Sequence, residues 1–149
     1  MQNVKAVVIG DEKVGKTAVI ASFADWGSIP DAHLPSVYNN VAHQIAVDDK
    51  YIHIGIWDTS SSAAFDRLRP LSYPRTDVFL LLYDVSNKET LQHLQSKWLP
   101  EKQHHCPAAS FGVVGCKTDL RERMQTMPVN DEMDETRLKL VVCHWLRQH

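Results

Sequence analysis

A run of residues near the N-terminus has the types and spacing of a phosphate-binding loop. Residues 10–17 read Gly10-Asp11-Glu12-Lys13-Val14-Gly15-Lys16-Thr17 and match the pattern G-x-x-x-x-G-K-[ST]. In such a loop the backbone N–H groups surround phosphate oxygens, the Lys16 ammonium neutralises charge and the Thr17 hydroxyl reaches Mg²⁺. An apolar strand-like run precedes the loop and a helix-like segment follows it, so a helix N-terminus adds partial positive charge. The sequence therefore predicts a phosphate site.

Two aspartates stand where they could complete this site. Asp58 closes a predicted strand, where a carboxylate can hold Mg²⁺ through water opposite the phosphate-binding loop. Asp119 follows another strand directly and can accept hydrogen bonds from both the ring N–H and the exocyclic amine of guanine, a pair that adenine does not offer. The Lys117 stem can cover the ring face. The alternative for Asp119 is a solvated loop carboxylate, which the order of the motifs along the chain disfavours.

The elements that must position these residues follow from hydrophobic periodicity. Short β-branched runs predict strands at 4–9, 41–47, 51–58, 78–83 and 111–115, the second and third of which form a hairpin. Helices are predicted at 16–25, 66–73, 87–104 and from Asn130 to near the C-terminus, with a loop at 26–40. We expect Pro100 to bend or end the third of these helices. The pattern predicts an α/β fold, a mostly parallel sheet with helices on both faces.

Composition sets the class of protein. The 149 residues are 44% hydrophobic and 23% charged, values typical of one globular domain. Sixteen Lys and Arg against eighteen Asp and Glu leave a net charge of -2, without the basic excess of a nucleic-acid binder. Three cysteines at unrelated spacings fit no disulfide framework or zinc site and favour a reducing, cytoplasmic location. No apolar run reaches the roughly 18 residues of a membrane helix.

With these motifs in place, the chain resembles a Ras-superfamily small GTPase and, within it, the Rho/Rac family. The resemblance runs from Val4 to about His149. Besides the phosphate-binding loop, the Rho-like stretches are Asp66-Arg67-Leu68-Arg69-Pro70-Leu71-Ser72-Tyr73-Pro74, Lys97-Trp98-Leu99-Pro100-Glu101, His104-His105-Cys106-Pro107 and Thr118-Asp119-Leu120-Arg121. It implies one P-loop G domain over residues 1–149 that binds GTP or GDP with Mg²⁺ in signal transduction, with cytoskeleton regulation as the family setting. Effector and regulator proteins would read two switch loops, 27–41 and 59–74.

The resemblance also implies a set of site residues. Nucleotide contacts fall on Gly10, Lys13, Val14, Gly15, Lys16, Thr17, Ala18, Ser36, Asp58, Lys117, Asp119 and Leu120. The metal ligands are Thr17, Ser36 and, through water, Asp58.

Departures from the family pattern bear on catalysis. Glu12 stands where the family has glycine beside the terminal phosphate, and we expect its side chain to turn to solvent and obstruct an arginine finger. Ser61 replaces a glycine and Ser62 replaces the glutamine that orients the attacking water. No catalytic residue is then intact, so hydrolysis is predicted to be weak or absent. Cys116 puts a weak thiol donor beside the base.

The ending is a further departure. The family continues with another strand, a long final helix and a prenylated cysteine box, whereas this sequence stops at His149. We therefore expect a G domain that lacks its last strand and helix, with no residue for lipid anchoring to a membrane.

Two other functions are weighed against a GTP-binding switch. A nucleotide-free pseudoGTPase that acts as a protein-interaction module is favoured by Glu12, Ser61 and Cys116. The intact Lys16 and Asp119, with the rest of the phosphate-binding motif, oppose it. A P-loop kinase of a small metabolite would need a lid and an acceptor site, for which the sequence has no segment.

Overall fold

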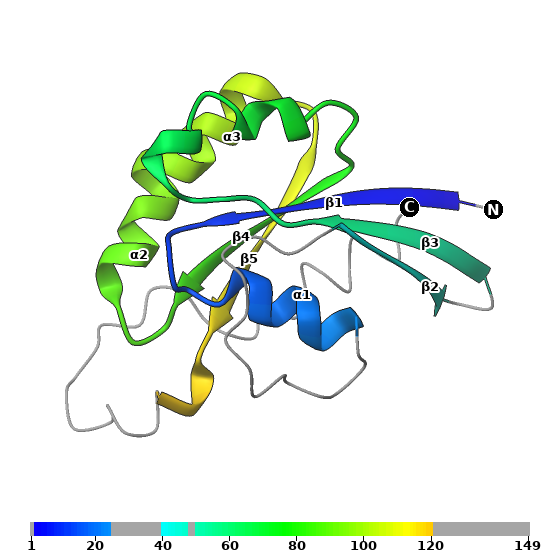
Figure 1. Cartoon of the computed structure of the whole chain (residues 1–149), viewed down its shortest axis with the longest axis horizontal. Helices are drawn as coiled ribbons and strands as arrows, with labels where there is room; N and C mark the ends of the chain where they lie inside the picture. The colour runs from blue at the N-terminus through cyan, green and yellow to red at the C-terminus, as the bar shows by residue number, and fades with distance from the viewer. Residues whose placement is uncertain (1, 25–39, 48–49, 121–149) are drawn as a thin grey trace.

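Five strands form one mixed sheet in the computed structural model, which describes residues 2–24, 40–47 and 50–120 (Figure 1). The strands are β1 (Gln2–Gly10), β2 (Val41–Val47), β3 (Lys50–Trp57), β4 (Val78–Asp84) and β5 (Ser110–Cys116). Their order across the sheet is β2-β3-β1-β4-β5; β2 and β3 pair antiparallel and all other pairs are parallel. This confirms the α/β class, the mostly parallel sheet and the predicted hairpin.

The central position of β1 explains the apolar run at residues 6–9. Val7 and Ile9 point into one hydrophobic core and Ala6 and Val8 into another on the opposite face of the sheet. All four side chains are almost completely buried. A strand covered on both faces is apolar throughout, because neither row of its alternating side chains meets water.

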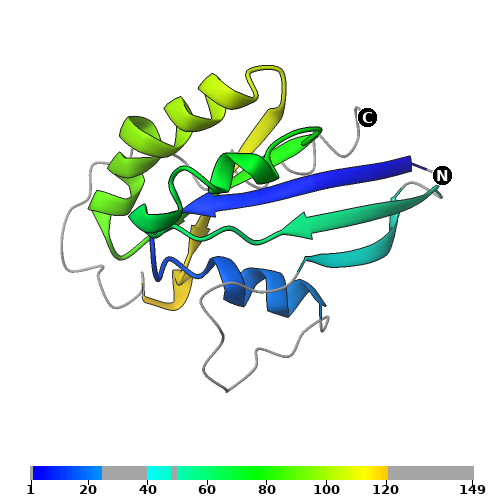
Figure 2. The ribbon, with the colours of Figure 1, turned by 45° about the horizontal axis from the view of Figure 1, so that its top comes forward.

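Helices cover both faces of the sheet, as predicted (Figure 2). The helix α1 (Lys16–Ala24) packs on one face, where Ile20 joins the core. The other face carries α2 (Lys88–His93), the π-helical turn η3 (Leu94–Trp98) and α3 (Leu99–His105). Asn87 caps α2, since its side chain accepts a hydrogen bond from the Glu89 N–H at 3.0 Å. The large Trp98 side chain is 1% exposed and belongs to the core of this face.

The expectation that Pro100 ends the helix early is wrong. The helical segment runs on to His105, and Pro100 lies in the first turn of α3. Proline lacks the N–H that an α-helix interior requires, but it is tolerated in a first turn. The π-helical turn prepares this position, because the Leu99 N–H bonds the Leu94 carbonyl five residues back.

The helix predicted at 66–73 is also not formed. Two short 3₁₀ helices stand in this region instead, η1 (Ala63–Phe65) and η2 (Arg69–Ser72). The reason is Pro70, which has no N–H to bond the carbonyl of residue 66 and so interrupts α-helical pairing. The turns close over three residues, as in the 3.1 Å bond from the Tyr73 N–H to the Pro70 carbonyl.

Some predictions fall outside the described residues. These are the first switch loop except residues 40 and 41, Ser36 within it, the final helix from Asn130, and the expected lack of a last strand and helix. No helix within residues 2–24, 40–47 and 50–120 is long and apolar enough to span a membrane.

Candidate functional site

The predicted site residues within the described part of the chain lie at one edge of the sheet, where the parallel strands have their carboxyl ends (Figure 1). The phosphate-binding loop follows β1, Asp58 follows β3, and Lys117 and Asp119 follow β5. Parallel α/β sheets bind ligands in the crevice beyond this edge. Cys116 lies close to the phosphate-binding loop, because a Cβ on Gly15 would lie 3.6 Å from the Cys116 Cβ.

The backbone of the phosphate-binding loop has a shape that depends on glycine. Gly10 has φ of 152° and Gly15 has φ of 111°, and Lys13 between them is left-handed at 61°. A Cβ on Gly10 would lie 2.3 Å from the Leu82 carbonyl oxygen, so β4 leaves no room for any larger residue. These positive φ values turn the chain sharply from β1 into α1. Loops of this type make anion-binding concavities.

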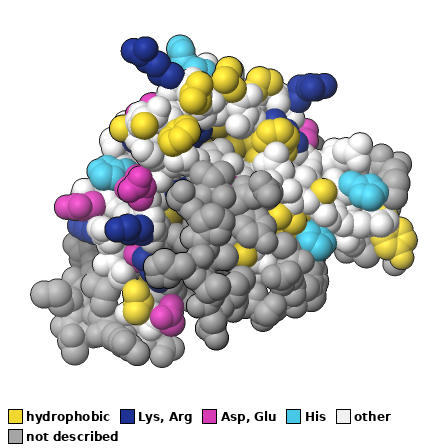
Figure 3. Space-filling view, in the orientation of Figure 1, with side chains coloured by type: hydrophobic (Ala, Val, Ile, Leu, Met, Phe, Trp, Pro, Cys, Tyr) yellow, Lys and Arg dark blue, Asp and Glu magenta, His cyan; other side chains and the backbone are white. Residues whose placement is uncertain are grey.

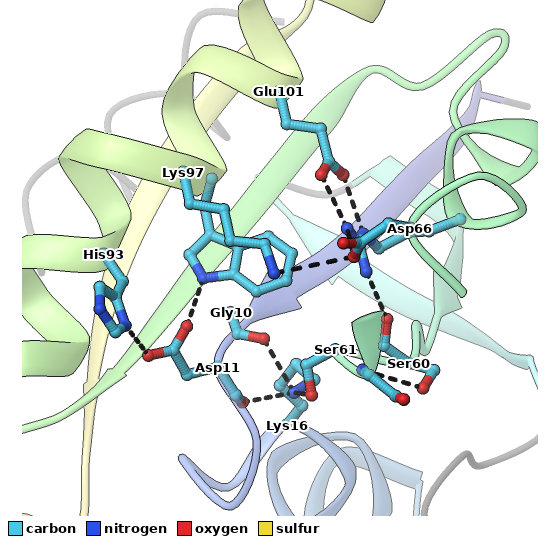
Figure 4. Close-up of polar contacts among 12 residues, drawn as sticks. Gly10, Asp11, Lys16, Ser60, Ser61, Asp66, His93, Lys97 and Glu101 are labelled. Carbon is cyan, nitrogen blue, oxygen red and sulfur yellow. Dashed lines mark hydrogen bonds and ion pairs between the residues drawn. The ribbon is translucent and has the colours of Figure 1, made fainter. Parts of the chain in front are cut away.

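Lys16 is held at the centre of the loop (Figure 4). Its ammonium donates to the carbonyls of Gly10 at 3.0 Å and Asp11 at 2.6 Å, and to the Ser61 hydroxyl at 3.2 Å. The side chain is buried, and burial lowers the pKa of the ammonium despite the nearby carboxylates of Asp58, Asp11 and Glu12. A positive charge placed so far from water interacts strongly with an incoming anion.

Thr17 and Asp58, two of the predicted metal ligands, are in contact. The Thr17 hydroxyl donates to Asp58 Oδ2 at 2.8 Å, and Asp58 is only 7% exposed. The next residue fixes this segment to the central strand, because the Thr59 hydroxyl donates to the Val8 carbonyl at 2.6 Å. A hydroxyl and a carboxylate supply the oxygen ligands that Mg²⁺ prefers. The residues present therefore fit a Mg²⁺-bound phosphate group.

The two positions that depart from the family's catalytic pattern lie close to this cluster. Glu12 is exposed, as expected for a carboxylate that avoids the phosphate site. Ser62 is partly exposed, and its backbone N–H donates to the Ser60 hydroxyl at 3.3 Å.

On the opposite side of the site, Lys117 is held by a residue that the sequence prediction missed. Lys117 has φ of 61°, and its ammonium donates to Asp84 Oδ2 at 2.6 Å. Burial raises the pKa of the Asp84 carboxyl, but the hydrogen bonds from Lys117 and Ser86 outweigh this and lower it. Asp119 is exposed in the short helix η4 (Thr118–Leu120). The sequence does contain one indication of Asp84, because it is an aspartate at the end of a buried strand, much as Asp58 closes a predicted strand.

Cys116 behaves as a buried neutral thiol. Burial raises its pKa to about 11, and the side chain is 8% exposed. At neutral pH it therefore offers the site a weak S–H donor.

A second missed contact anchors the phosphate-binding loop to the helices on the far face (Figure 4). The Asp11 carboxylate accepts from Trp98 Nε1 at 2.7 Å and pairs with His93 Nδ1 at 2.5 Å. Trp98 is buried in the core of this face, and its indole N–H also holds the loop. The π-helical turn places His93 and Trp98 on the same side of the helix, which no α-helical pattern indicates.

The segment 59–74 is attached to α3 through Arg69, which is 4% exposed. Its guanidinium donates twice to Glu101, at 2.8 and 2.7 Å, and also to the Ser60 carbonyl at 2.9 Å and to Asp66 at 2.7 Å. The Tyr73 hydroxyl donates to the same Glu101 carboxylate. Burial raises the pKa of Glu101, but hydrogen bonds from Arg69 and Tyr73 outweigh it and lower the pKa. This paired arrangement fixes the backbone that follows Asp58.

Fold and site together define a P-loop nucleotide-binding domain of the α/β class. A model of the Ras family matches residues 5–143, which is nearly the whole chain. The chain therefore belongs to the Ras family. Its fold is that of a G domain, and it is a small GTPase of the guanine-nucleotide-binding switch type. Proteins of this family bind GTP or GDP with Mg²⁺ and interact with effectors and regulators.

The Arg69–Glu101 pair predicts a specific pH dependence of stability. Replacing Glu101→Gln leaves a buried guanidinium with one fewer countercharge, and we expect the free energy of unfolding at pH 7 to fall by about 3 kcal/mol. Because the pKa of Glu101 is lowered from 4.5 in the folded state, its contribution is complete above pH 4.5 and is lost as the pH falls further. Urea unfolding between pH 3 and 7 measures both effects.

Glu89→Gln is the matched control, since Glu89 is exposed on α2. We expect its stability curve to follow that of the wild type. A Glu101→Gln curve that stays parallel to the wild type below pH 4.5 would contradict the assignment.

The Asp84–Lys117 contact predicts an effect on nucleotide retention. Asp84→Asn removes the charge that holds the Lys117 ammonium, and we expect nucleotide to dissociate about tenfold faster, the worth of one charged hydrogen bond. The dissociation rates of GDP and GTP should rise by the same factor. The reason is that Lys117 follows β5, on the side of the site opposite Thr17 and Asp58. The measurement is release of a fluorescent guanine nucleotide in Mg²⁺. Asp77→Asn, directly before the other end of β4, is the control; equal rates for both variants would exclude the role of Asp84.

Proposed function

We propose that this protein is a Rho-like guanine-nucleotide switch that binds GTP with Mg²⁺ and hydrolyses it weakly or not at all. One observation carries the proposal. Lys16, Thr17 and Asp58 are assembled in mutual reach of the phosphate-binding loop, while serine occupies the position from which water would be activated. The residues for binding nucleotide are thus retained, and the residue for hydrolysing GTP is replaced.

Each side chain has a distinct role in binding. Lys16 and the loop amides, with Gly10, Lys13, Val14, Gly15 and Ala18 in the same segment, hold the phosphates. Thr17 and Ser36 would hold Mg²⁺, and Asp58 would support it through water. The bound ion would neutralise part of the phosphate charge. On the base side, Lys117 covers the ring, Leu120 flanks it and Asp119 selects guanine by accepting from two of its N–H groups.

Weak hydrolysis follows from the length of the Ser62 side chain. A glutamine amide reaches an attacking water and orients it, whereas a serine hydroxyl is two heavy atoms shorter. Glu12 adds a second obstacle. Its exposed carboxylate stands at the mouth of the loop, where an arginine supplied by a partner would have to approach the phosphates.

The Rho-like assignment is supported by how the resembling stretches meet. The stretch 66–74 and the stretch 97–101 are joined by the Arg69–Glu101 pair and by Tyr73. Two distant Rho-like stretches whose side chains contact each other support the assignment more strongly than either stretch alone. Signalling linked to the cytoskeleton is the setting that this kinship suggests. The free thiols of Cys106 and Cys116 fit a cytoplasmic location.

The partners we propose are effector and regulator proteins that contact residues 27–41 and 59–74. In the second segment Phe65, Leu68 and Leu71 are 46%, 55% and 74% exposed. Hydrophobic side chains gather on the upper part of the molecular surface, over α3 and its surroundings (Figure 3). Exposed apolar residues of this size mark protein contact sites when they cluster.

A nucleotide-free interaction module is the second candidate. It is favoured by the internal hydrogen bonds of Lys16, whose ammonium contacts two carbonyls and one hydroxyl of the protein itself. Such a loop is stable without phosphate. The partly buried Thr17–Asp58 contact argues against it, because a binding module has no need of this oxygen pair beside the lysine.

Base selectivity is the direct test of the proposed function. We expect the wild type to bind GDP and a non-hydrolysable GTP analogue in Mg²⁺, and to prefer them to the adenine nucleotides by about 10⁴-fold or more. Asp119→Ala should remove most of this preference. Isothermal titration with the four nucleotides measures both. Failure to bind either guanine nucleotide would leave the interaction module as the function.

The account of slow hydrolysis has its own test. The double variant Glu12→Gly with Ser62→Gln should raise the single-turnover rate of GTP hydrolysis by about tenfold or more, because it restores a side chain that can orient water and clears the loop. Ser96→Gln, an exposed serine on η3, controls for the substitution itself. If the double variant binds GTP and its rate does not rise, Ser62 is not the cause of slow turnover.

A further inference from the structure

The three N–H groups of the Lys16 ammonium have different acceptors, and only one of them lies outside the phosphate-binding loop. Two point to carbonyls of the phosphate-binding loop, Gly10 and Asp11, at 3.0 and 2.6 Å. These carbonyls belong to the same loop as the lysine and hold its ammonium in place. The third hydrogen points out of the loop to the Ser61 hydroxyl at 3.2 Å. This N–H can change its acceptor from the Ser61 hydroxyl to a phosphate oxygen while the ammonium stays in the same place.

Ser61 is kept within reach of the site by its neighbours. On its N-terminal side Thr59 is bonded to the Val8 carbonyl of the central strand at 2.6 Å. The Ser60 carbonyl accepts from the buried Arg69 guanidinium at 2.9 Å. Figure 4 shows Ser61 beside Lys16. The hydroxyl therefore stays beside the ammonium because two bonds fix the backbone before it.

A hydroxyl differs from any apolar residue at this position because it both donates and accepts. When a phosphate oxygen replaces the Ser61 oxygen as acceptor of the third Lys16 hydrogen bond, it lies beside the Ser61 hydroxyl. The hydroxyl can then donate its own hydrogen to that phosphate oxygen. Hydrogen bonds from a hydroxyl to an ionised oxygen are short and about twice as strong as neutral ones.

The position of Ser61 indicates which phosphate it meets. Residues 10–17 enclose the inner phosphates with their own amides, and the lysine reaches outward to the last two. Ser61 approaches the lysine from outside the loop, three residues after Asp58 in the chain, on the side where Mg²⁺ would bridge the outer phosphates. The outermost phosphate is present in GTP and absent in GDP.

We propose that the Ser61 hydroxyl is a direct ligand of the terminal phosphate of GTP, shared with Lys16, and that it gives this chain a side-chain-based preference for the triphosphate over GDP. The inference rests on the proposed function, since it assigns a role within the same nucleotide site. Ser61 is a specificity-determining residue here.

The test compares the affinities of Ser61 variants for a non-hydrolysable GTP analogue and for GDP, both in Mg²⁺. Ser61→Ala should weaken binding of the analogue about tenfold and leave GDP binding within about twofold, because only the analogue carries the outermost phosphate. Ser61→Thr keeps the hydroxyl and should restore most of the preference. Ser96→Ala, which removes an exposed serine hydroxyl on η3, should change neither affinity.

Each outcome has a defined meaning. An equal loss for both nucleotides, or no change for either, overturns the role of Ser61 and leaves the proposed function intact. A tighter triphosphate complex in Ser61→Ala also overturns it, since the hydroxyl would then compete with phosphate for Lys16. A wild type that binds neither nucleotide rejects the proposed function as well as this inference. Urea unfolding without nucleotide confirms that every variant is folded, and Ser61→Gly supplies a second hydroxyl-free variant.

Discussion

The structure of the site depends on placing one lysine ammonium inside the protein, where burial outweighs the effect of the nearby carboxylates on its pKa. Lys16 is 7% exposed, and two backbone carbonyls compensate for part of its lost hydration. Those carbonyls are available only because the loop turns through Gly10 and Gly15 at positive φ. Burial lowers the pKa of the ammonium because it disfavours the charged form. An anion bound beside the ammonium would stabilise that charge. The remaining elements position partners for that charge.

Both faces of the sheet contribute to holding this arrangement. On the face of α1, the Thr17 hydroxyl at the end of the loop donates a hydrogen bond to Asp58, which follows β3. On the other face, Trp98 and His93 hold the Asp11 carboxylate, and Arg69 holds the backbone after Asp58 through Ser60. The helical layer over α2 and α3 is therefore connected to both segments that flank the phosphates. A partner that displaced Arg69 from Glu101 would act on the site without touching nucleotide.

Much of this was accessible from sequence, and the failures have physical causes. Strands and hairpin could be predicted because their apolar patterns are local, and the loop because its spacing encodes a backbone shape. In the structure Lys16 lies within this loop and the Thr17 hydroxyl donates to Asp58. The helix predicted over 66–73 is wrong because one missing N–H at Pro70 outweighs composition. Pro100 does not end its helix, because it lies in the first turn that follows a π-helical turn. Asp84, Asp11 and Arg69 act through partners 33, 87 and 32 residues away, and pairings at such distances leave no periodic signal in one sequence.

The central claim is that a retained phosphate site in this Ras-family chain holds guanine nucleotide that it cannot readily hydrolyse. The most direct measurement is to purify the protein in Mg²⁺, denature it and identify the released nucleotide by chromatography. The account predicts GTP, in an amount close to one molecule per chain, because a chain lacking the water-orienting residue retains the triphosphate it binds. A folded protein that releases no nucleotide, and takes up none after incubation with GTP and Mg²⁺, would contradict it.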